Sequence, residues 1–154
     1  MGFYQVKSSA LVKRYVHEIG SGFIQSLLDP VSGNTISLSH ISFVEVASAL
    51  GRKYRGGVIT LMERNIAYSV LKRHFLLEYH LVEVNQSVLS LAADLTQQHP
   101  LRAYDAIQLA SALIVNADLL SHALPPLVFV CADAKLCLAA IAEGLVTDNP
   151  NLHP

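Results

Sequence analysis

Three carboxylates interrupt segments of the chain that are otherwise apolar. Glu45 lies in the run FVEVASAL, Asp105 lies in AYDAIQLA, and Asp133 directly follows the apolar run LVFVCA. A carboxylate among apolar side chains is costly to bury unless another group pairs with it. Mg²⁺ or Mn²⁺, which prefer oxygen ligands, would pair with all three, polarise a phosphate and activate water. The pattern therefore favours a divalent-metal site with Glu45, Asp105 and Asp133 as metal ligands and catalytic residues.

Each of these carboxylates also has a simpler explanation. Asp105 in a first helical turn would favour the helix dipole, and Asp133 would serve as the N-cap of the last helix. Glu45 would pair with Arg52 two helical turns later. A shared site is favoured because all three acids lie near strand ends or in first helical turns, where distant segments can meet.

Basic side chains near these acids could contact the backbone of RNA. The candidates are Arg14 after the first strand, Arg52 near a helix end, and Arg102 beside Asp105. A formal net charge of −1 argues against a protein that holds nucleic acid by overall positive charge, so any RNA contact must be a local patch. Cations at a helix C-terminus are also favourable on dipole grounds alone. No GxGxxG, P-loop or HExxH motif indicates a nucleotide site or a paired-histidine zinc site.

Alternating strands and helices must position these side chains. We expect strands at residues 3–6, 35–39, 80–84 and 127–131, with a short edge strand at Val146. We expect helices at residues 10–16, 23–28, 42–54, 61–78, 86–98, 103–119 and 134–142, with caps at Ser8 or Ser9, at Thr60 with Glu63, and at Asn85. This alternation predicts a mostly parallel sheet with helices on both sides, and functional groups at the carboxyl ends of its strands.

Composition sets the broad class. A length of 154 residues fits one domain, which we expect over residues 1–150 with a short tail at 151–154. The 52% hydrophobic and 15% charged content excludes a disordered chain. No secretory signal or membrane span is visible, and Cys131 and Cys137 lack a CxxC spacing. We therefore expect a cytoplasmic protein with two buried thiols and no membrane contact.

Several segments resemble the PIN family, especially the VapC-like toxins. The resemblance extends over nearly the whole chain, and its most specific run is LRAYDAIQLA at residues 101–110; the other runs are SSALVKRY at 8–15, SFVEVASAL at 42–50 and ADAKL at 132–136. It implies a three-layer αβα PIN-like domain around a mostly parallel sheet of four to five strands. It also implies an endoribonuclease that uses Mg²⁺ or Mn²⁺, acts as the toxin of a toxin–antitoxin pair, binds an antitoxin protein and forms a homodimer.

The chain departs from this family at one position of the site. The resemblance implies four acidic residues, of which Glu45, Asp105 and Asp133 are present, but Lys7 stands where the first aspartate is expected. For a divalent ion about 5 Å away, at an effective dielectric of about 20, this change costs on the order of 10 kcal/mol before relaxation. Lys7 could neutralise one of the acids, hold a phosphate as a point charge, or point to solvent. The two functions left open are a metal-dependent ribonuclease and a catalytically inactive PIN-fold module that binds RNA or protein.

Overall fold

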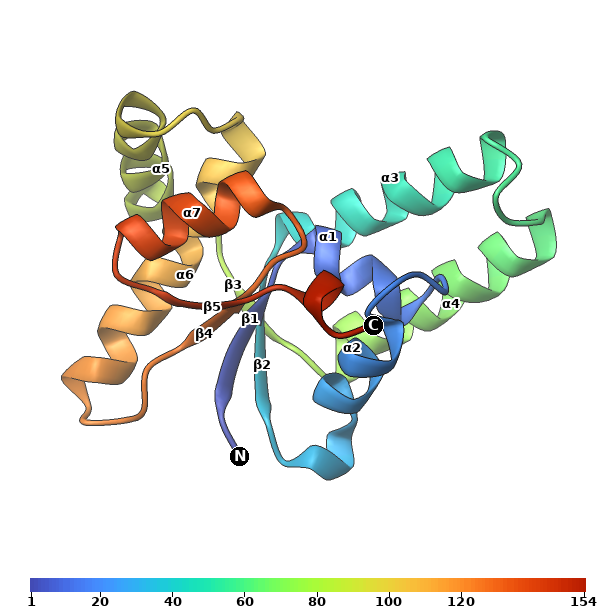
Figure 1. The fold of residues 1–154 in the computed structure, drawn as a ribbon, viewed down its shortest axis with the longest axis horizontal. Coiled ribbons are helices and arrows are strands. Elements are labelled where there is room, and N and C mark those ends of the chain that lie inside the picture. Colours follow the sequence, from blue (N-terminus) through green and yellow to red (C-terminus); the bar gives the residue numbers. More distant parts are fainter.

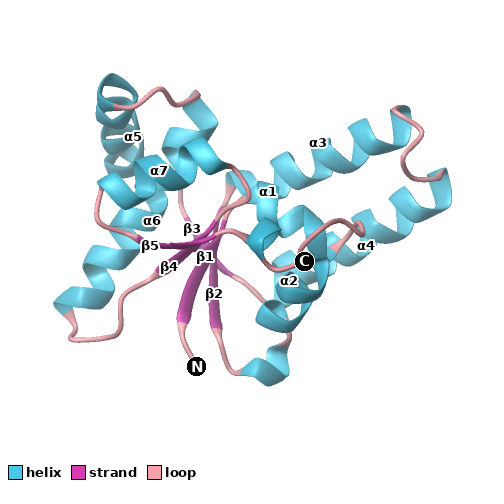
Figure 2. Ribbon diagram, viewed as in Figure 1, coloured by secondary structure: helices cyan, strands magenta, loops and turns pink.

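The computed structural model describes residues 1–154, and its centre is a sheet of five parallel strands in the order β3-β2-β1-β4-β5 (Figure 2). The strands are β1 (Phe3–Val6), β2 (Thr35–Ser39), β3 (His80–Val82), β4 (Val128–Val130) and β5 (Val146–Asp148). The first strand occupies the middle, with Gln5 aligned with Ser37 of β2 on one side and Phe129 of β4 on the other. Strands β1, β2 and β4 therefore end together, and the residues that follow them meet at one edge of the sheet.

Helices cover both faces of the sheet (Figure 1). Their bounds are α1 (Ser8–Leu11), α2 (Ser21–Leu28), α3 (Ile41–Arg55), α4 (Leu61–Leu77), α5 (Gln86–Gln98), α6 (Ala103–Ser121) and α7 (Ala134–Ala142). Helices α1 to α4 lie on one side, and α5 to α7 lie on the other. The expected three-layer αβα arrangement is confirmed. None of these helices combines the length and the apolar content that crossing a bilayer requires.

The core consists of two apolar clusters, one on each face of the sheet. One cluster joins β1 and β2 to helices α1 to α4, and the other joins β4 to helices α5 to α7. Because both faces are covered, interior strand residues such as Val6, Leu38 and Phe129 are completely buried. Cys131 and Cys137 are free and buried, as expected. The neighbouring Cys137 thiol and burial both raise the pKa of the Cys131 thiol.

The start of the first helix differs from the prediction. Neither Ser8 nor Ser9 caps a helix through Val16; the N-cap is Lys7, which makes no side-chain capping bond, and α1 gives way to a 3₁₀ turn at Val12–Arg14. The hydroxyl of Ser9 instead accepts a hydrogen bond from the Ala132 backbone N–H at 3.2 Å. This bond ties the segment after β1 to the segment after β4.

Two further 3₁₀ turns complete the chain, at Pro30–Ser32 and Pro150–Leu152. The last turn lies against α2, where the His153 ring stacks on Phe23 with a centroid distance of 4.0 Å. The Asn151 amide donates to the Ala132 carbonyl at 3.3 Å. Residues 150–153 thus contact the body of the domain.

Candidate functional site

A cavity of about 970 Å³ opens at the carboxyl ends of the central strands. It is lined by the end of β1, by α1 and α3, by the start of α6 and by the residue before α7. We call this cavity the cleft. Its charged side chains are four basic and four acidic residues, whose formal charges cancel: Lys7, Arg52, Lys53, Arg102, Glu18, Glu45, Asp105 and Asp133. The cleft therefore gathers the three candidate ligands, Lys7, and two of the three candidate RNA-binding arginines.

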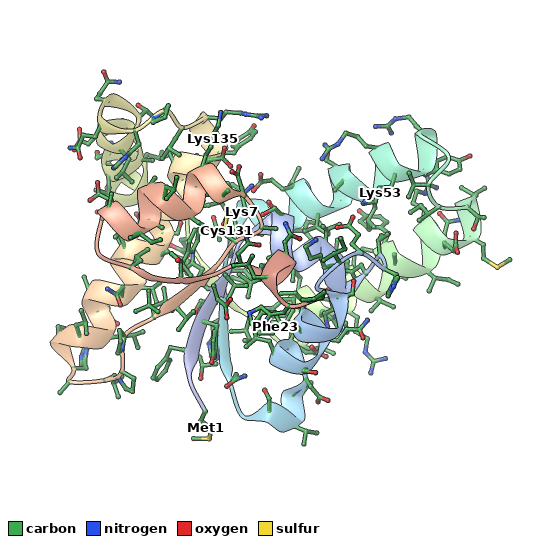
Figure 3. The ribbon with its side chains drawn as sticks, in the orientation of Figure 1. Met1, Lys7, Phe23, Lys53, Cys131 and Lys135 are labelled. Carbon is green, nitrogen blue, oxygen red and sulfur yellow. The ribbon has the colours of Figure 1, made fainter.

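The Lys7 ammonium lies beside the Asp105 carboxylate in this cleft. The distance from Nζ to Oδ1 is 3.1 Å, and the two side chains are only 10% and 16% exposed. Side chains alternate along a strand, and Lys7 continues the extended backbone of β1, so Gln5 and Lys7 both point towards α6. Figure 3 shows Lys7 close to Cys131, where the central strands end. Of the three acids that Lys7 could neutralise, Asp105 is the one with which it forms an ion pair.

The Glu45 carboxylate is bound by an amide. Gln108 Nε2 donates to Glu45 Oε1 at 2.7 Å and to Ser42 Oγ at 2.8 Å. Gln5 Nε2 in turn donates to the Gln108 backbone carbonyl at 3.3 Å. The alternative pairing of Glu45 with Arg52 is not observed, because Arg52 donates to Ser48 one turn away, at 2.8 Å.

The Asp133 carboxylate caps the last helix. Its Oδ1 accepts the backbone N–H groups of Lys135 at 3.0 Å and Leu136 at 3.3 Å. The alternative explanation, in which Asp133 is the N-cap of the last helix, is therefore confirmed. The carboxylate also borders the cleft, so it can serve as a cap while facing a ligand there.

These carboxylates do not fit a divalent cation as they stand. No group of three acidic, histidine or cysteine side chains in the chain is arranged to hold a metal ion. Asp105 contacts an ammonium, Glu45 an amide, and Asp133 two backbone N–H groups. None of their oxygens is buried without a hydrogen-bond partner. The chain's own donors therefore already compensate for the burial of these carboxylates, as a bound cation would.

The three candidate RNA-binding arginines fall into two groups. Arg52 and Arg102 are exposed and border the cleft. Arg14, which was expected to add to the same patch, does not border the cleft. Its side chain is 14% exposed, and its guanidinium lies 2.8 Å from the Glu78 carboxylate and donates to the Tyr79 hydroxyl at 2.5 Å. Arg14 is therefore held inside a polar network under α4.

Sequence reasoning missed two features of the cleft. Gln108 was not among the candidate residues, although a polar side chain one turn after Asp105 on an apolar helix was an available signal. The second is Glu18, which accepts hydrogen bonds from Lys13 at 3.1 Å and from Lys53. Burial acts in the opposite direction, but the bonds from Lys53 and Lys13 lower the pKa of Glu18. No local pattern links these three residues.

Comparison with solved structures identifies the fold. PAE2754 from Pyrobaculum aerophilum superposes with a TM-score of 0.61 at 19% identity, over 94% of this chain and 88% of that chain. VapBC2 from Rickettsia felis, solved bound to a DNA fragment from its promoter, gives 0.63 at 14% identity, over 97% of this chain and 98% of that chain. The chain has a PIN-domain fold.

A toxin–antitoxin complex from Klebsiella pneumoniae shows the same PIN fold, with a TM-score of 0.58 at 16% identity over 96% of this chain and 97% of that chain. No protein-family model matches the sequence, and no curated protein matches it either. At these identities the similarity shows the PIN fold alone.

Proposed function

We propose that this protein is a VapC-like PIN-fold member of a toxin–antitoxin pair, and that its cleft binds RNA without a divalent cation. The observation that carries the proposal is the Lys7–Asp105 ion pair, which supplies an internal cation to the acidic cluster. We expect an antitoxin protein as its partner in the cytoplasm. The support is the fold that the chain shares with solved structures, two of which are toxin–antitoxin assemblies by name.

The charge of the cleft supports RNA binding without metal. With Lys7 present, the basic and acidic side chains around the cleft balance, whereas an aspartate at that position would leave an excess of two negative charges. A strongly negative cleft repels phosphates unless cations screen it. Arg52 and Arg102 are exposed at the rim and can contact phosphate oxygens once that repulsion is removed.

A metal-dependent ribonuclease is the second candidate. It is favoured by the presence of Glu45, Asp105 and Asp133 around a single cavity. For this function Lys7 would have to leave Asp105, and the acids would have to exchange their present donors for an ion. Both candidates place RNA in the cleft, and they differ in whether metal binds and whether the RNA is cut.

The decisive experiment compares the natural chain with Lys7→Asp and Lys7→Met. Mn²⁺ binding is measured by calorimetry, and RNA affinity by fluorescence anisotropy in EDTA. We expect no tight Mn²⁺ site in the natural chain and a gain of Mn²⁺ binding in Lys7→Asp. We expect Lys7→Met to raise the RNA dissociation constant roughly tenfold, about 1.4 kcal/mol, because Asp105 is left unpaired.

Controls distinguish the two candidates. Lys72→Met removes an exposed lysine on α4, outside the cleft, and is expected to leave RNA affinity unchanged. Metal-dependent RNA cleavage by the natural chain that disappears in Asp105→Asn would establish the ribonuclease instead. Equal RNA affinity in the natural chain and in Lys7→Met would remove the cleft as the binding site.

A further inference from the structure

The ring of Tyr104 borders the cleft and has no stacking partner within the chain. Tyr104 lies in the first turn of α6, lines the cleft and is 62% exposed. Every other tyrosine ring packs against a core cluster or stacks on another ring or a cation: Tyr4, Tyr15, Tyr54, Tyr68 and Tyr79. An aromatic ring contributes most to binding when a ligand covers its face. Tyr104 therefore presents an uncovered aromatic surface to a molecule that enters the cleft.

A second exposed apolar side chain borders the cleft from α3. Val44 is 66% exposed and lines the cleft. Hydrogen bonds connect the two helices at this point, because Gln108 of α6 donates to Ser42 and Glu45, which lie on either side of Val44 in the sequence. Gln108 comes four residues after Tyr104 and therefore lies on the same face of α6. Tyr104 and Val44 thus lie on the two walls of the cleft, close to where α6 and α3 are connected.

Each apolar surface has an arginine beside it. Val44, Ser48 and Arg52 follow one another at four-residue spacing along α3, and all three line the cleft. The Arg52 guanidinium donates to Ser48 Oγ at 2.8 Å, which directs it back along α3 towards Val44. On the other wall, Arg102 lies two residues before Tyr104 and also lines the cleft. An aromatic surface beside cations is the arrangement that binds a base together with its phosphate.

A base-paired duplex does not match these surfaces. Within a duplex, each base is covered by its stacked neighbours, so only an unpaired base has a free face to lay on a tyrosine ring. The two arginines favour an anionic ligand over an apolar segment of a protein, since a phosphate can accept from a guanidinium while the base covers the ring.

We infer that the cleft holds an unpaired nucleobase against the ring of Tyr104, with Val44 on the other side of the base and a neighbouring phosphate at Arg52 or Arg102. This rests on the proposed function, in which RNA binds in the cleft. It adds the class of RNA, a single strand, and it assigns the contact with the base to Tyr104.

A tryptophan in place of Tyr104 reports stacking directly. The chain contains no tryptophan, so Tyr104→Trp introduces a single fluorescent reporter at this position. In a titration with a single-stranded oligoadenylate in EDTA, we expect the emission to fall as a base stacks on the indole. Affinity should stay within about threefold of the natural value, because the larger ring also stacks. In the control, Tyr68→Trp places the reporter on α4, where position 68 is 40% exposed and outside the cleft, and its emission should not change.

Affinity gives an independent measurement. Tyr104→Ala is expected to raise the dissociation constant for the oligoadenylate roughly tenfold, because the base loses the ring on which it stacks. An abasic strand of the same length keeps the phosphates, and it should bind the natural chain and Tyr104→Ala equally. The matched control Tyr68→Ala should leave both affinities unchanged. Circular dichroism and the melting temperature of each variant establish that it is folded.

The outcomes separate this inference from the proposed function. Oligoadenylate binding that is weakened by Lys7→Met but not by Tyr104→Ala would refute the base contact and leave RNA binding in the cleft in place. A Tyr104→Ala loss that is equally large for the abasic strand, or an unchanged Tyr104→Trp emission at saturation, would also refute the base contact. If the natural chain binds neither strand, both the inference and the proposed function are wrong.

Discussion

Arg14 lies within a buried polar network and not at the surface where its charge would suggest. Its guanidinium contacts the Glu78 carboxylate and the Tyr79 hydroxyl, and the Tyr15 hydroxyl lies 2.9 Å from that of Tyr79. Burial raises the pKa of Tyr79, so its hydroxyl keeps its proton. The network joins the turn after α1 to the end of α4, across more than 60 residues of sequence. This arrangement gives Arg14 a structural role.

Replacing Arg14 tests that role. Arg14→Met should lower the free energy of unfolding by roughly 2 kcal/mol, because it leaves a partly buried carboxylate without its charged partner. Urea denaturation measures the loss. RNA affinity should stay at the natural value, in contrast to Lys7→Met. An Arg14→Met variant with natural stability and weakened RNA binding would contradict the structural role and indicate that Arg14 contacts RNA.

Helices α4 and α5 begin at N-caps that short-range sequence patterns predict. The capping box of Thr60 and Glu63 forms as expected, with both of its hydrogen bonds present. Asn85 caps α5 by accepting the Val88 N–H at 3.0 Å. These caps join neighbours only three residues apart, so the sequence alone was sufficient to predict them. The strand bounds of β1 and β2 were predicted for the same reason, from local runs of apolar and β-branched residues.

Removing the Asn85 cap gives a measurable loss. Asn85→Ala should reduce the free energy of unfolding by about 1 kcal/mol, because one N–H of the first turn of α5 loses its acceptor. Gln98→Ala, an exposed change at the opposite end of α5, should alter stability far less. Equal losses in the two variants would mean that the cap contributes nothing specific.

Contacts between remote segments set the limit of prediction from sequence. The expected serine cap of α1 was wrong because Ser9 binds the Ala132 N–H, a residue 123 positions later. The acids were expected near strand ends or in first helical turns, where distant segments meet, and all three border the cleft, yet the partner of Lys7 was left open. Asp105 is that partner because β1 alternation directs Lys7 towards α6. The Gln108 bond to Glu45 joins residues of α6 and α3 that are 63 positions apart in the sequence, which no local pattern describes.

Stability of the molecule as a whole should depend on pH through His74. This ring lies between the Tyr15 hydroxyl, 2.8 Å from Nδ1, and the Glu78 carboxylate, with Arg14, Arg73 and Tyr79 nearby. Burial, followed by the charge of Arg14, lowers the pKa of His74. The folded state therefore binds this proton less readily than the unfolded state does.

The sign of the pH effect follows from that difference. Because the pKa of His74 is lower in the folded state, the unfolded chain takes up a proton first as pH falls below about 6.5. The free energy of unfolding therefore decreases as pH falls from about 6.5 to the lowered pKa of the folded state. Urea unfolding at about pH 7.5 and about pH 5.5 should show lower stability at the acidic value. His74→Gln, which keeps an acceptor for Tyr15, should flatten the dependence. An unchanged slope in the variant would assign the effect to other groups.

The central place of β1 in the sheet also determines when this protein can fold during its synthesis on the ribosome. A nascent chain that has reached the end of β3 has made three of the five strands, but β1 still has one bare edge, since β4 begins at Val128. Lys7 meets its carboxylate only after α6 has been translated. Interrupted synthesis would thus yield fragments with an open strand edge, which are prone to aggregation and proteolysis. The residues that line the cleft extend from Lys7 to Asp133, so a chain truncated before Asp133 would lack a complete cleft.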